Sequence, residues 1–241
     1  MLTVHHLGIS QSERIVWLCE ELDIPYTLTT HTRDPILAPD SLKSLPGNET
    51  GKAPFIEDSD AGVTLSESGA ICDYIIGRYG KGKLQAKPSD KNFADYVFWF
   101  HYANASLHPA MTCCMFVQYG EVPATNMMKG LADQRLHTAL GLLDARLSTN
   151  KWLAGNEESS FSAADVMTVY CLTTQRYWGP QVDLAQYKGI LRYLRDCCTR
   201  PAYRRAMEKG DPEMKVLSGP EAPEKGMIDL GGTKSEHWKK G

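Results

Sequence analysis

The chain has 241 residues, with 26 Lys and Arg against 29 Asp and Glu, which gives a formal net charge of -3. Its hydrophobic fraction of 42% and charged fraction of 23% are ordinary for a globular protein, so disorder is not expected. Basic residues are scattered along the chain, which argues against nucleic acid as a partner. No stretch approaches the roughly 18 apolar residues that cross a bilayer, so no membrane partner is expected.

The start of the chain and its cysteines both favour an intracellular protein. Met1 is followed directly by a polar, His-containing segment, without the apolar stretch of a signal peptide, and we expect a cytoplasmic location. The seven cysteines form no CxxC and no zinc-like spacing. We therefore expect neither a metal site nor a disulfide framework.

The first 80 residues alternate between short β-prone segments and helical patterns. Apolar residues recur every three or four positions in the helical segments, which gives each helix one apolar face. A polar turn at residues 58–61 predicts a hairpin. We expect strands at residues 2–7, 26–30, 53–57 and 62–65, helices at 10–22 and 67–79, and mostly irregular chain at 31–50. This order predicts one mixed sheet flanked by helices, with a right-handed crossover between the first two strands.

The remainder of the chain is predicted to be helical. Gly, Lys, Pro and Ser dominate residues 81–90, which is typical of a linker between domains. We expect long helices at 91–118, 124–148 and 163–178, a shorter one at 186–198 and another after Pro201. The last segment has few large apolar side chains and is expected to be loosely ordered. The predicted limits are a first domain at 1–80, a linker at 81–90, a helical domain at 91–208 and a tail at 209–241.

Two serines precede the first predicted helix. Ser10 and Ser12 lie where unpaired backbone N–H groups and the helix dipole stabilise an anion. A free thiol has a pKa of about 8.5, and lowering it by about two units takes roughly 2.7 kcal/mol. One hydroxyl hydrogen bond together with the dipole supplies an effect of that size. The spacing alone, however, favours helix capping by one of the two serines.

A second set of residues flanks the predicted hairpin. Pro54 enters a strand, where a cis peptide bond would turn the backbone groups of Ala53 outward to pair with an extended peptide. Glu67 and Ser68 open the next helix, where a ligand carboxylate is favoured and Glu67 can bind an ammonium group. Lys52 can neutralise a second carboxylate. Together these residues suit a small zwitterionic peptide that carries a thiol, although Lys52 and Glu67 also fit as solvated surface charges.

These motifs, in this order, resemble the serine-type glutathione S-transferases. The run from His6 to Leu22 is similar to the first strand and helix of fungal and bacterial members related to the yeast GTT-like group. The segment Gly51–Pro54 resembles the family's cis-proline element, and Glu67-Ser68 resembles its γ-glutamyl clamp. Phe161–Asp165 matches the family's N-capping box, which is structural. The resemblance covers residues 2–208.

The resemblance implies an α/β thioredoxin-like N-terminal domain followed by an all-α helical domain. It also implies that Ser10 hydrogen-bonds the glutathione sulfur, with Ser12 as the alternative. Lys52 would meet the glycyl carboxylate, Ala53-Pro54 the cysteinyl backbone, and Glu67-Ser68 the γ-glutamyl end. The implied cofactor or co-substrate is glutathione, without a metal. A homodimer is the family expectation.

An aromatic stretch at residues 96–111 resembles the first long helix of the family's substrate domain. The candidate residues for contact with a small hydrophobic electrophile are His101, Tyr102, Met111, Met115 and Trp178. Helical spacing alone favours core packing or dimer contacts for most of them.

Three functions fit the sequence. The first is transfer of glutathione to an electrophilic carbon. The second is glutathione-dependent cis-trans isomerisation of a conjugated double bond, as in fungal specialised metabolism. The third is a non-catalytic glutathione-binding scaffold.

Overall fold

The structure, a computed structural model, describes residues 1–240 and divides into two compact units. The first unit joins residues 1–85 to residues 198–216 and to the end of the described chain from residue 227. The second unit joins residues 86–197 to residues 217–226. The chain first leaves one unit for the other after Gln85, inside the segment that the sequence indicates as a linker.

A four-stranded mixed sheet forms the centre of the first unit, as the sequence predicts. Its order is β2-β1-β3-β4, with bounds β1 (Leu2–Leu7), β2 (Thr27–His31), β3 (Phe55–Asp58) and β4 (Val63–Ser66). β1 is parallel to β2 and antiparallel to β3, so Val4 lies opposite Leu28 on one side and Ile56 on the other. β3 and β4 form the expected antiparallel hairpin. The carboxyl end of β1, which leads to the two serines, is therefore central in the sheet.

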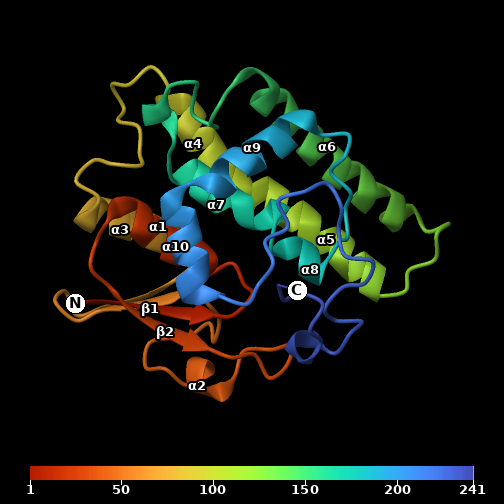
Figure 1. Ribbon diagram of the computed structural model, residues 1–241, viewed down its shortest axis with the longest axis horizontal. Helices are drawn as coiled ribbons and strands as arrows, with labels where there is room; N and C mark the ends of the chain where they lie inside the picture. Colours follow the sequence, from red (N-terminus) through yellow and green to blue (C-terminus); the bar gives the residue numbers. More distant parts are fainter. Residues whose placement is uncertain (241) are drawn as a thin grey trace. The chain divides into compact units, whose positions relative to one another are not determined.

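The described part of the first unit contains four α-helices: α1 (Glu13–Leu22), α2 (Asp40–Lys43), α3 (Ser68–Tyr79) and α10 (Pro201–Gly210). α1 and α10 lie side by side (Figure 1). The rings of Trp17 and Tyr203 meet edge to face with centroids 4.8 Å apart. The Glu20 carboxylate accepts hydrogen bonds from Arg205, at 2.9 Å, and from Lys209. Apolar packing and charge thus join helices that are far apart in sequence.

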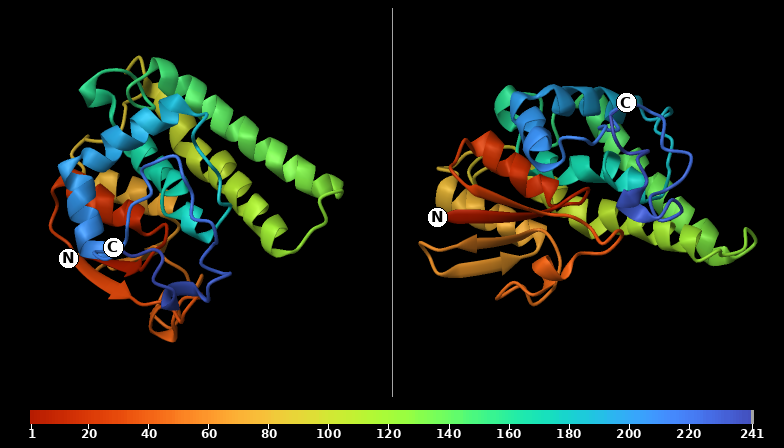
Figure 2. Two further views of the ribbon diagram at one scale, coloured as in Figure 1. Left: turned by 45° about the vertical axis from the view of Figure 1, so that its right-hand side comes forward. Right: turned by 60° about the horizontal axis from the view of Figure 1, so that its bottom comes forward.

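The second unit is helical, as predicted. Its α-helices are α4 (Phe93–Tyr102), α5 (His108–Tyr119), α6 (Met127–Thr149), α7 (Ala163–Leu172), α8 (Gln175–Trp178) and most of α9 (Lys188–Thr199). α5 and α6 run side by side in both views of Figure 2, and α4 packs on α7. A π-helical turn at Ala103–Leu107 separates α4 from α5, and non-helical torsions at Thr173 separate α7 from α8. The predicted helix 163–178 is therefore divided in two, whereas the predicted helix 91–118 continues through the π-helical turn, because the backbone torsions on both sides of that turn are helical.

At the C-terminal end, the limits of the two compact units differ from the expected domain limits. α10 falls within the expected helical domain 91–208 but belongs to the first unit, because its buried face packs on α1. The expected loosely ordered tail is held by backbone hydrogen bonds, since Lys215 N–H donates to the Trp238 carbonyl at 2.8 Å. Met214 and Met227 are fully buried. A few well-placed apolar side chains and backbone pairs therefore order the described part of this segment.

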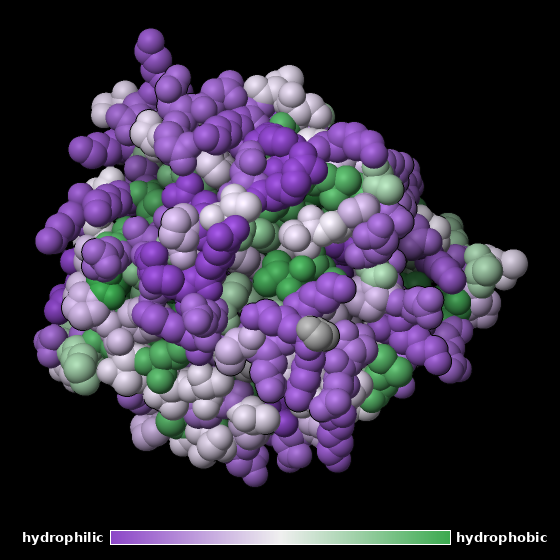
Figure 3. Space-filling model, in the orientation of Figure 1, coloured by the Kyte–Doolittle hydropathy of each residue, from purple (hydrophilic) through white to green (hydrophobic). Residues whose placement is uncertain are grey.

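One face of the molecule, drawn in Figure 3, is largely polar. Hydrophilic side chains cover most of the face drawn in Figure 3, and apolar atoms form small separate patches on it. None of the helices within residues 1–240 has the length and apolar character needed to span a membrane. In that same range, no three or more His, Cys, Asp or Glu side chains are grouped so that they could hold a metal ion.

Candidate functional site

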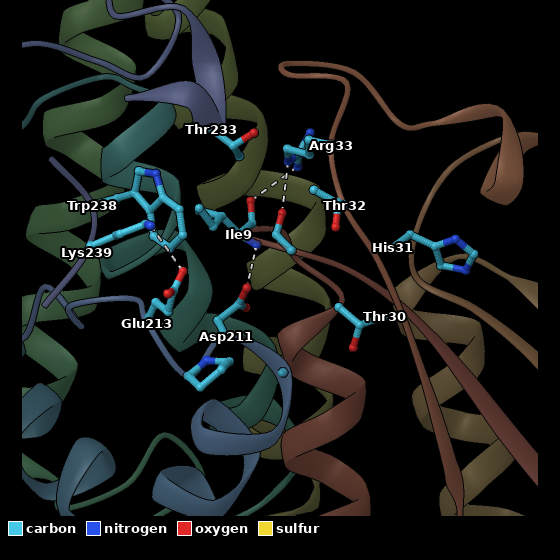
Figure 4. A pocket seen from close by; sticks show the side chains of 13 residues that line it. Ile9, Thr30, His31, Thr32, Arg33, Asp211, Glu213, Thr233, Trp238 and Lys239 are labelled. Carbon is cyan, nitrogen blue, oxygen red and sulfur yellow. Dashed lines mark hydrogen bonds and ion pairs between the residues drawn. The ribbon is translucent and has the colours of Figure 1, made fainter. Parts of the chain in front are cut away.

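The loop between β1 and α1 adopts an unfavourable backbone conformation at Ile9. Its φ of 53° lies in the left-handed region, which is costly for a β-branched residue. Asp211 Oδ1 accepts a hydrogen bond from the Ile9 N–H at 2.9 Å. The Arg33 guanidinium donates to the carbonyls of Gly8 and Ile9, at 2.9 and 3.2 Å (Figure 4). Arg33, which follows β2, and Asp211, which follows α10, therefore hold the loop before Ser10 in this conformation.

The two serines of this loop hydrogen-bond each other, with their Oγ atoms 2.7 Å apart. Ser12 occupies the N-cap position of α1 but makes no side-chain capping bond, so a capping role for Ser12 is wrong. Its Oγ instead accepts from the Leu7 N–H at 3.0 Å and lies 2.9 Å from His6 Nδ1. Ser10 Oγ accepts from the Ser12 N–H at 3.2 Å. Ser12 is thus engaged with β1, and Ser10 is the outer member of the pair.

His6 and Asp211 extend this hydrogen-bonded group, and sequence reasoning missed both. His6 Nε2 lies 3.0 Å from Asp211 Oδ2. The side chains come from β1 and from the residue after α10, so no local pattern brings them together. Gly210 packs against the His6 ring so closely that a Cβ atom on Gly210 would lie 3.1 Å from His6 Nε2. The absence of a side chain at Gly210 allows the end of α10 to approach the imidazole.

The segment before β3 has the expected cis peptide bond between Ala53 and Pro54. Ala53 is buried and Lys52 is exposed at the surface of the first unit. The buried Asn48 side chain donates to the carbonyls of Leu42 and Lys52, at 3.0 and 3.3 Å. Asn48 therefore fixes the turn that presents Lys52 and Ala53, a role that the sequence did not indicate.

Glu67 and Ser68 lie at the beginning of α3, as predicted. Glu67 has φ 72° and ψ 115°, a strained conformation for a residue with a side chain, and its carboxylate is exposed. Ser68 is buried and accepts a hydrogen bond from Arg14 Nη1 at 3.3 Å. Arg14 is fully buried and also donates to Gln11 Oε1 at 3.1 Å. Arg14 thus joins the beginnings of α1 and α3, a role that no pattern in the sequence indicates.

A pocket of about 420 Å³ lies beside the same loop (Figure 4). Ile9 and Asp211 form part of its wall, and Thr233, Trp238 and Lys239 contribute from the C-terminal segment. Lys239 Nζ is 3.4 Å from a Glu213 carboxylate oxygen. The sequence did not predict this pocket, because its walls come from four separate parts of the chain.

The expected electrophile-contacting residues all belong to the second unit and differ in their surroundings. Tyr102 is buried and donates its hydroxyl to the Ala139 carbonyl at 3.1 Å, and Met111 is fully buried. Packing explains both of these side chains. His101 is exposed. Met115 Sδ accepts a weak hydrogen bond from Gln175 Nε2 at 3.8 Å in the turn that ends at Trp178. The structure thus places Met115 against α8, the helix that ends at Trp178, and leaves His101 at the surface.

The sequence and the fold are both similar to those of known proteins. A family model described as "Glutathione S-transferase, N-terminal domain" matches residues 10–76. Glutathione S-transferase 3 of Schizosaccharomyces pombe is 32% identical over 233 residues, which cover 90% of this chain and 91% of the relative. A crystal structure of a glutathione S-transferase from Actinobacillus pleuropneumoniae has a TM-score of 0.76 at 26% identity, covering 88% of this chain and 93% of that one.

A crystal structure of a glutathione transferase homologue from Lodderomyces elongisporus, with two GSH per subunit, has a TM-score of 0.69. It covers 86% of this chain and 98% of that one at 16% identity, which shows a shared fold.

Proposed function

This chain belongs to the glutathione S-transferase family, and on that premise we propose that it activates the glutathione thiol for attack on an electrophilic small molecule. The proposal assigns the activating hydroxyl to Ser10 and treats Ser12 as its supporting partner. It assigns Lys52 to the glycyl carboxylate and the Ala53-Pro54 backbone to the cysteinyl part of glutathione. Glu67 and Ser68 would hold the γ-glutamyl end.

The observation that carries the proposal is the place of Ser10 Oγ. It lies at the beginning of α1, against the Ser12 N–H, in the same unit as the cis Ala53–Pro54 bond and the start of α3. The positive end of the α1 helix dipole stabilises a thiolate at such a position. A hydroxyl donor to the sulfur adds a charge-assisted hydrogen bond of about 1.5–3 kcal/mol.

Further support comes from the strained residues of this unit. Ile9 and Glu67 both have positive φ, and each adjoins a residue assigned to glutathione. Backbone strain of this kind concentrates at binding sites, where surrounding contacts hold it in place. The buried Arg14 side chain fixes Ser68 from the first turn of α1. These features suit a pre-organised site for a small zwitterionic peptide.

The Ser10→Ala variant tests the assignment. Loss of the hydroxyl donor should raise the pKa of the bound thiol by about one to two units, because a charge-assisted hydrogen bond of that strength is removed. Turnover near neutral pH should fall roughly tenfold to a hundredfold, with glutathione affinity nearly unchanged. A pH titration of the thiolate ultraviolet absorbance and steady-state kinetics measure both effects.

Ser59→Ala is the matched control, since Ser59 lies on the turn between β3 and β4 and, among residues 1–240, its hydroxyl hydrogen-bonds Met1 alone. The control variant should titrate and turn over like the unmodified protein. An unchanged thiol pKa in Ser10→Ala would contradict the assignment.

The outcome of the reaction separates transfer from isomerisation. Incubation with an aryl halide should consume glutathione if the protein is a transferase. With a conjugated polyene, a changed isomer ratio without consumption of glutathione would instead indicate isomerisation. Failure to bind immobilised glutathione would favour a scaffold. The homodimer, the cytoplasmic location and the electrophile contacts stay predictions; the residues predicted for those contacts are His101, Tyr102, Met111, Met115 and Trp178.

A further inference from the structure

A continuous chain of buried hydrogen bonds leads from Ser10 into the interior of the first unit. The successive atoms are Ser10 Oγ, Ser12 Oγ, His6 Nδ1 and, across the ring, His6 Nε2 and Asp211 Oδ2, with separations of 2.7, 2.9 and 3.0 Å. Ser12 and His6 are completely buried, and Ser10 and Asp211 are 4% and 6% exposed. Each separation is an ordinary hydrogen-bond length. The chain therefore connects the hydroxyl assigned to the sulfur with a buried carboxylate.

The donors and acceptors of this chain set its direction. The Asp211 carboxylate accepts a hydrogen bond from the His6 Nε2–H group, which leaves Nδ1 of a neutral imidazole as an acceptor. Ser12 then donates to Nδ1, because its Oγ already accepts from the Leu7 N–H and has one proton to give. Ser10 in turn donates to Ser12. The Leu7 carbonyl, 3.3 Å from Ser12 Oγ, is a more distant competing acceptor.

We propose that His6, held by Asp211, takes up the proton of the glutathione thiol through Ser12 and Ser10. The inference rests on the proposed function, since it requires a thiol beside Ser10. His6 and Asp211 do not contact the sulfur and act through the two serines. They are positioning and proton-accepting residues of the site rather than catalytic ones.

The proton transfer is balanced within the chain. The thiol S–H bond breaks and its proton goes to Ser10 Oγ, while the Ser10 proton goes to Ser12 Oγ and the Ser12 proton to His6 Nδ1. The products are a thiolate, two neutral serines and an imidazolium paired with the Asp211 carboxylate. All hydrogen bonds have then reversed, so that His6 donates to Ser12, Ser12 to Ser10, and Ser10 to the thiolate. The same step that removes the thiol proton therefore turns the Ser10 hydroxyl toward the sulfur.

The charges around His6 suit an imidazolium formed during the reaction. Asp211 supplies the negative partner at 3.0 Å. Two further imidazoles lie in this region, His31 on β2 and His5 on β1, 3.1 Å apart at their ring nitrogens. Burial, and next the neighbouring imidazoles, lower the pKa of His31, and burial lowers that of His5 against an opposing contribution from Glu57. Both rings therefore stay neutral near pH 7 and add no positive charge against His6.

Nitrogen NMR of histidine-labelled protein tests the proposal directly. At a pH above the ordinary pKa of histidine, saturation with glutathione should convert the His6 signals from the neutral to the imidazolium pattern. S-methylglutathione, which has no thiol proton, should leave His6 neutral. A second readout is the proton released when glutathione binds in weak buffer, which should be near zero for the unmodified protein although the thiolate absorbance is present.

Asp211→Asn isolates the charge, because an amide oxygen can still accept from the Ile9 N–H while the amide nitrogen can donate to His6 Nε2. His6 Nδ1 then carries a proton and cannot accept another. Formation of the thiolate should now release about one proton per site, and the pKa of the bound thiol should rise by about one unit, a roughly tenfold effect. Unchanged affinity for S-methylglutathione would show that the variant keeps its site.

His31→Gln is the matched control, since it removes a neighbouring imidazole that is outside the hydrogen-bonded chain. It should leave proton release at the unmodified value. The proposal is overturned if His6 stays neutral while the thiolate forms, or if Asp211→Asn changes neither proton release nor thiol pKa. Should Ser10→Ala still raise the thiol pKa in that event, the proposed function stands without the relay. If Ser10→Ala has no effect either, the proposed function fails with it.

Discussion

Asp58, at the end of β3, is a buried carboxylate with three partners from one helix. The hydroxyls of Tyr74 and Tyr79 donate to its Oδ2 at 2.6 and 2.5 Å, and Arg78 Nε lies at 3.0 Å. Burial opposes ionisation of Asp58, but the two tyrosine hydrogen bonds and the Arg78 charge outweigh it and lower the pKa to about 2. The Asp58 carboxylate thereby joins α3 to strand β3 of the sheet.

The free energy of unfolding should depend on Asp58 ionisation at low pH. The folded-state pKa is below the unfolded value of about 3.9, so the stabilisation is complete above that pH and is lost as the pH falls toward 2. The shift corresponds to roughly 2 kcal/mol. Asp58→Asn should lose about that amount at neutral pH and flatten the acid limb, as measured by urea unfolding across pH.

Asp40→Asn serves for comparison, because the Asp40 side chain is 98% exposed and its pair with Lys43 is a surface one. It should change stability little at any pH. An acid limb that persists in Asp58→Asn would count against this account.

Helix α7 shows a capping motif that the sequence predicted and the structure confirms. The Ser162 side chain accepts from the N3 backbone, and Asp165 Oδ2 accepts from the Ser162 N–H at 2.9 Å. Asp165 Oδ1 also accepts from the Leu153 N–H at 3.0 Å, a contact beyond the motif itself. Asp165 therefore satisfies donors of both α7 and the preceding loop, all of them buried.

Asp165→Ala should destabilise the protein by about 2–4 kcal/mol, because it leaves two buried N–H donors without their acceptor. Asn126→Ala is the matched comparison, since Asn126 caps α6 in an exposed position through a 2.9 Å bond from the Met128 N–H. Its cost should be nearer 1 kcal/mol. Denaturant unfolding of the two variants measures the difference. Equal costs would mean that burial of the motif does not matter.

On the scale of the whole molecule, segments distant in sequence complete the first unit. α10 covers α1, Asp211 supports the loop before Ser10, and the last described residues close one side of the pocket. The C-terminal segment is attached by bonds such as those from the Thr233 N–H and hydroxyl to the Pro35 carbonyl, both 3.0 Å. Asp211 lies before this segment, and its own side chain contacts His6 and Ile9 directly.

A chain that ends after Gly226 should therefore keep thiol activation and lose stability. The loss of several hydrogen bonds, each of about 0.5–1.5 kcal/mol, should lower the thermal midpoint by several degrees. The pKa of the thiol of bound glutathione should stay within about half a unit of its value in the full-length protein. Thermal unfolding followed by circular dichroism and thiolate titration check the two parts. A large rise in thiol pKa would place the C-terminal segment in the site itself.

Much of the fold was open to prediction because its signals are local. Apolar periodicity and polar turns gave the four strands and the main helices within a few residues, and the cis-proline element was expected from Pro54. The break after Leu172 has no neighbouring proline or glycine to predict it, and the π-helical turn at Ala103–Leu107, which precedes Pro109 in the first turn of α5, is a departure within a helix that the apolar period does not show. Ser12 was misjudged as a possible cap, since its position is that of an N-cap while its hydroxyl bonds to His6 and Leu7.

By itself, the sequence determined the order of elements, the mixed sheet with a following helical part, and the residues that resemble a glutathione site. Those features depend on spacings of a few residues, which a single chain displays directly. Only the tertiary structure decided that Asp211 meets His6, that Arg14 joins two helix beginnings and that α10 belongs with the sheet. Such contacts form only where segments distant in the sequence come together. A buried pair of hydrogen-bonding side chains leaves no periodic pattern in the sequence, so the sequence alone does not reveal it.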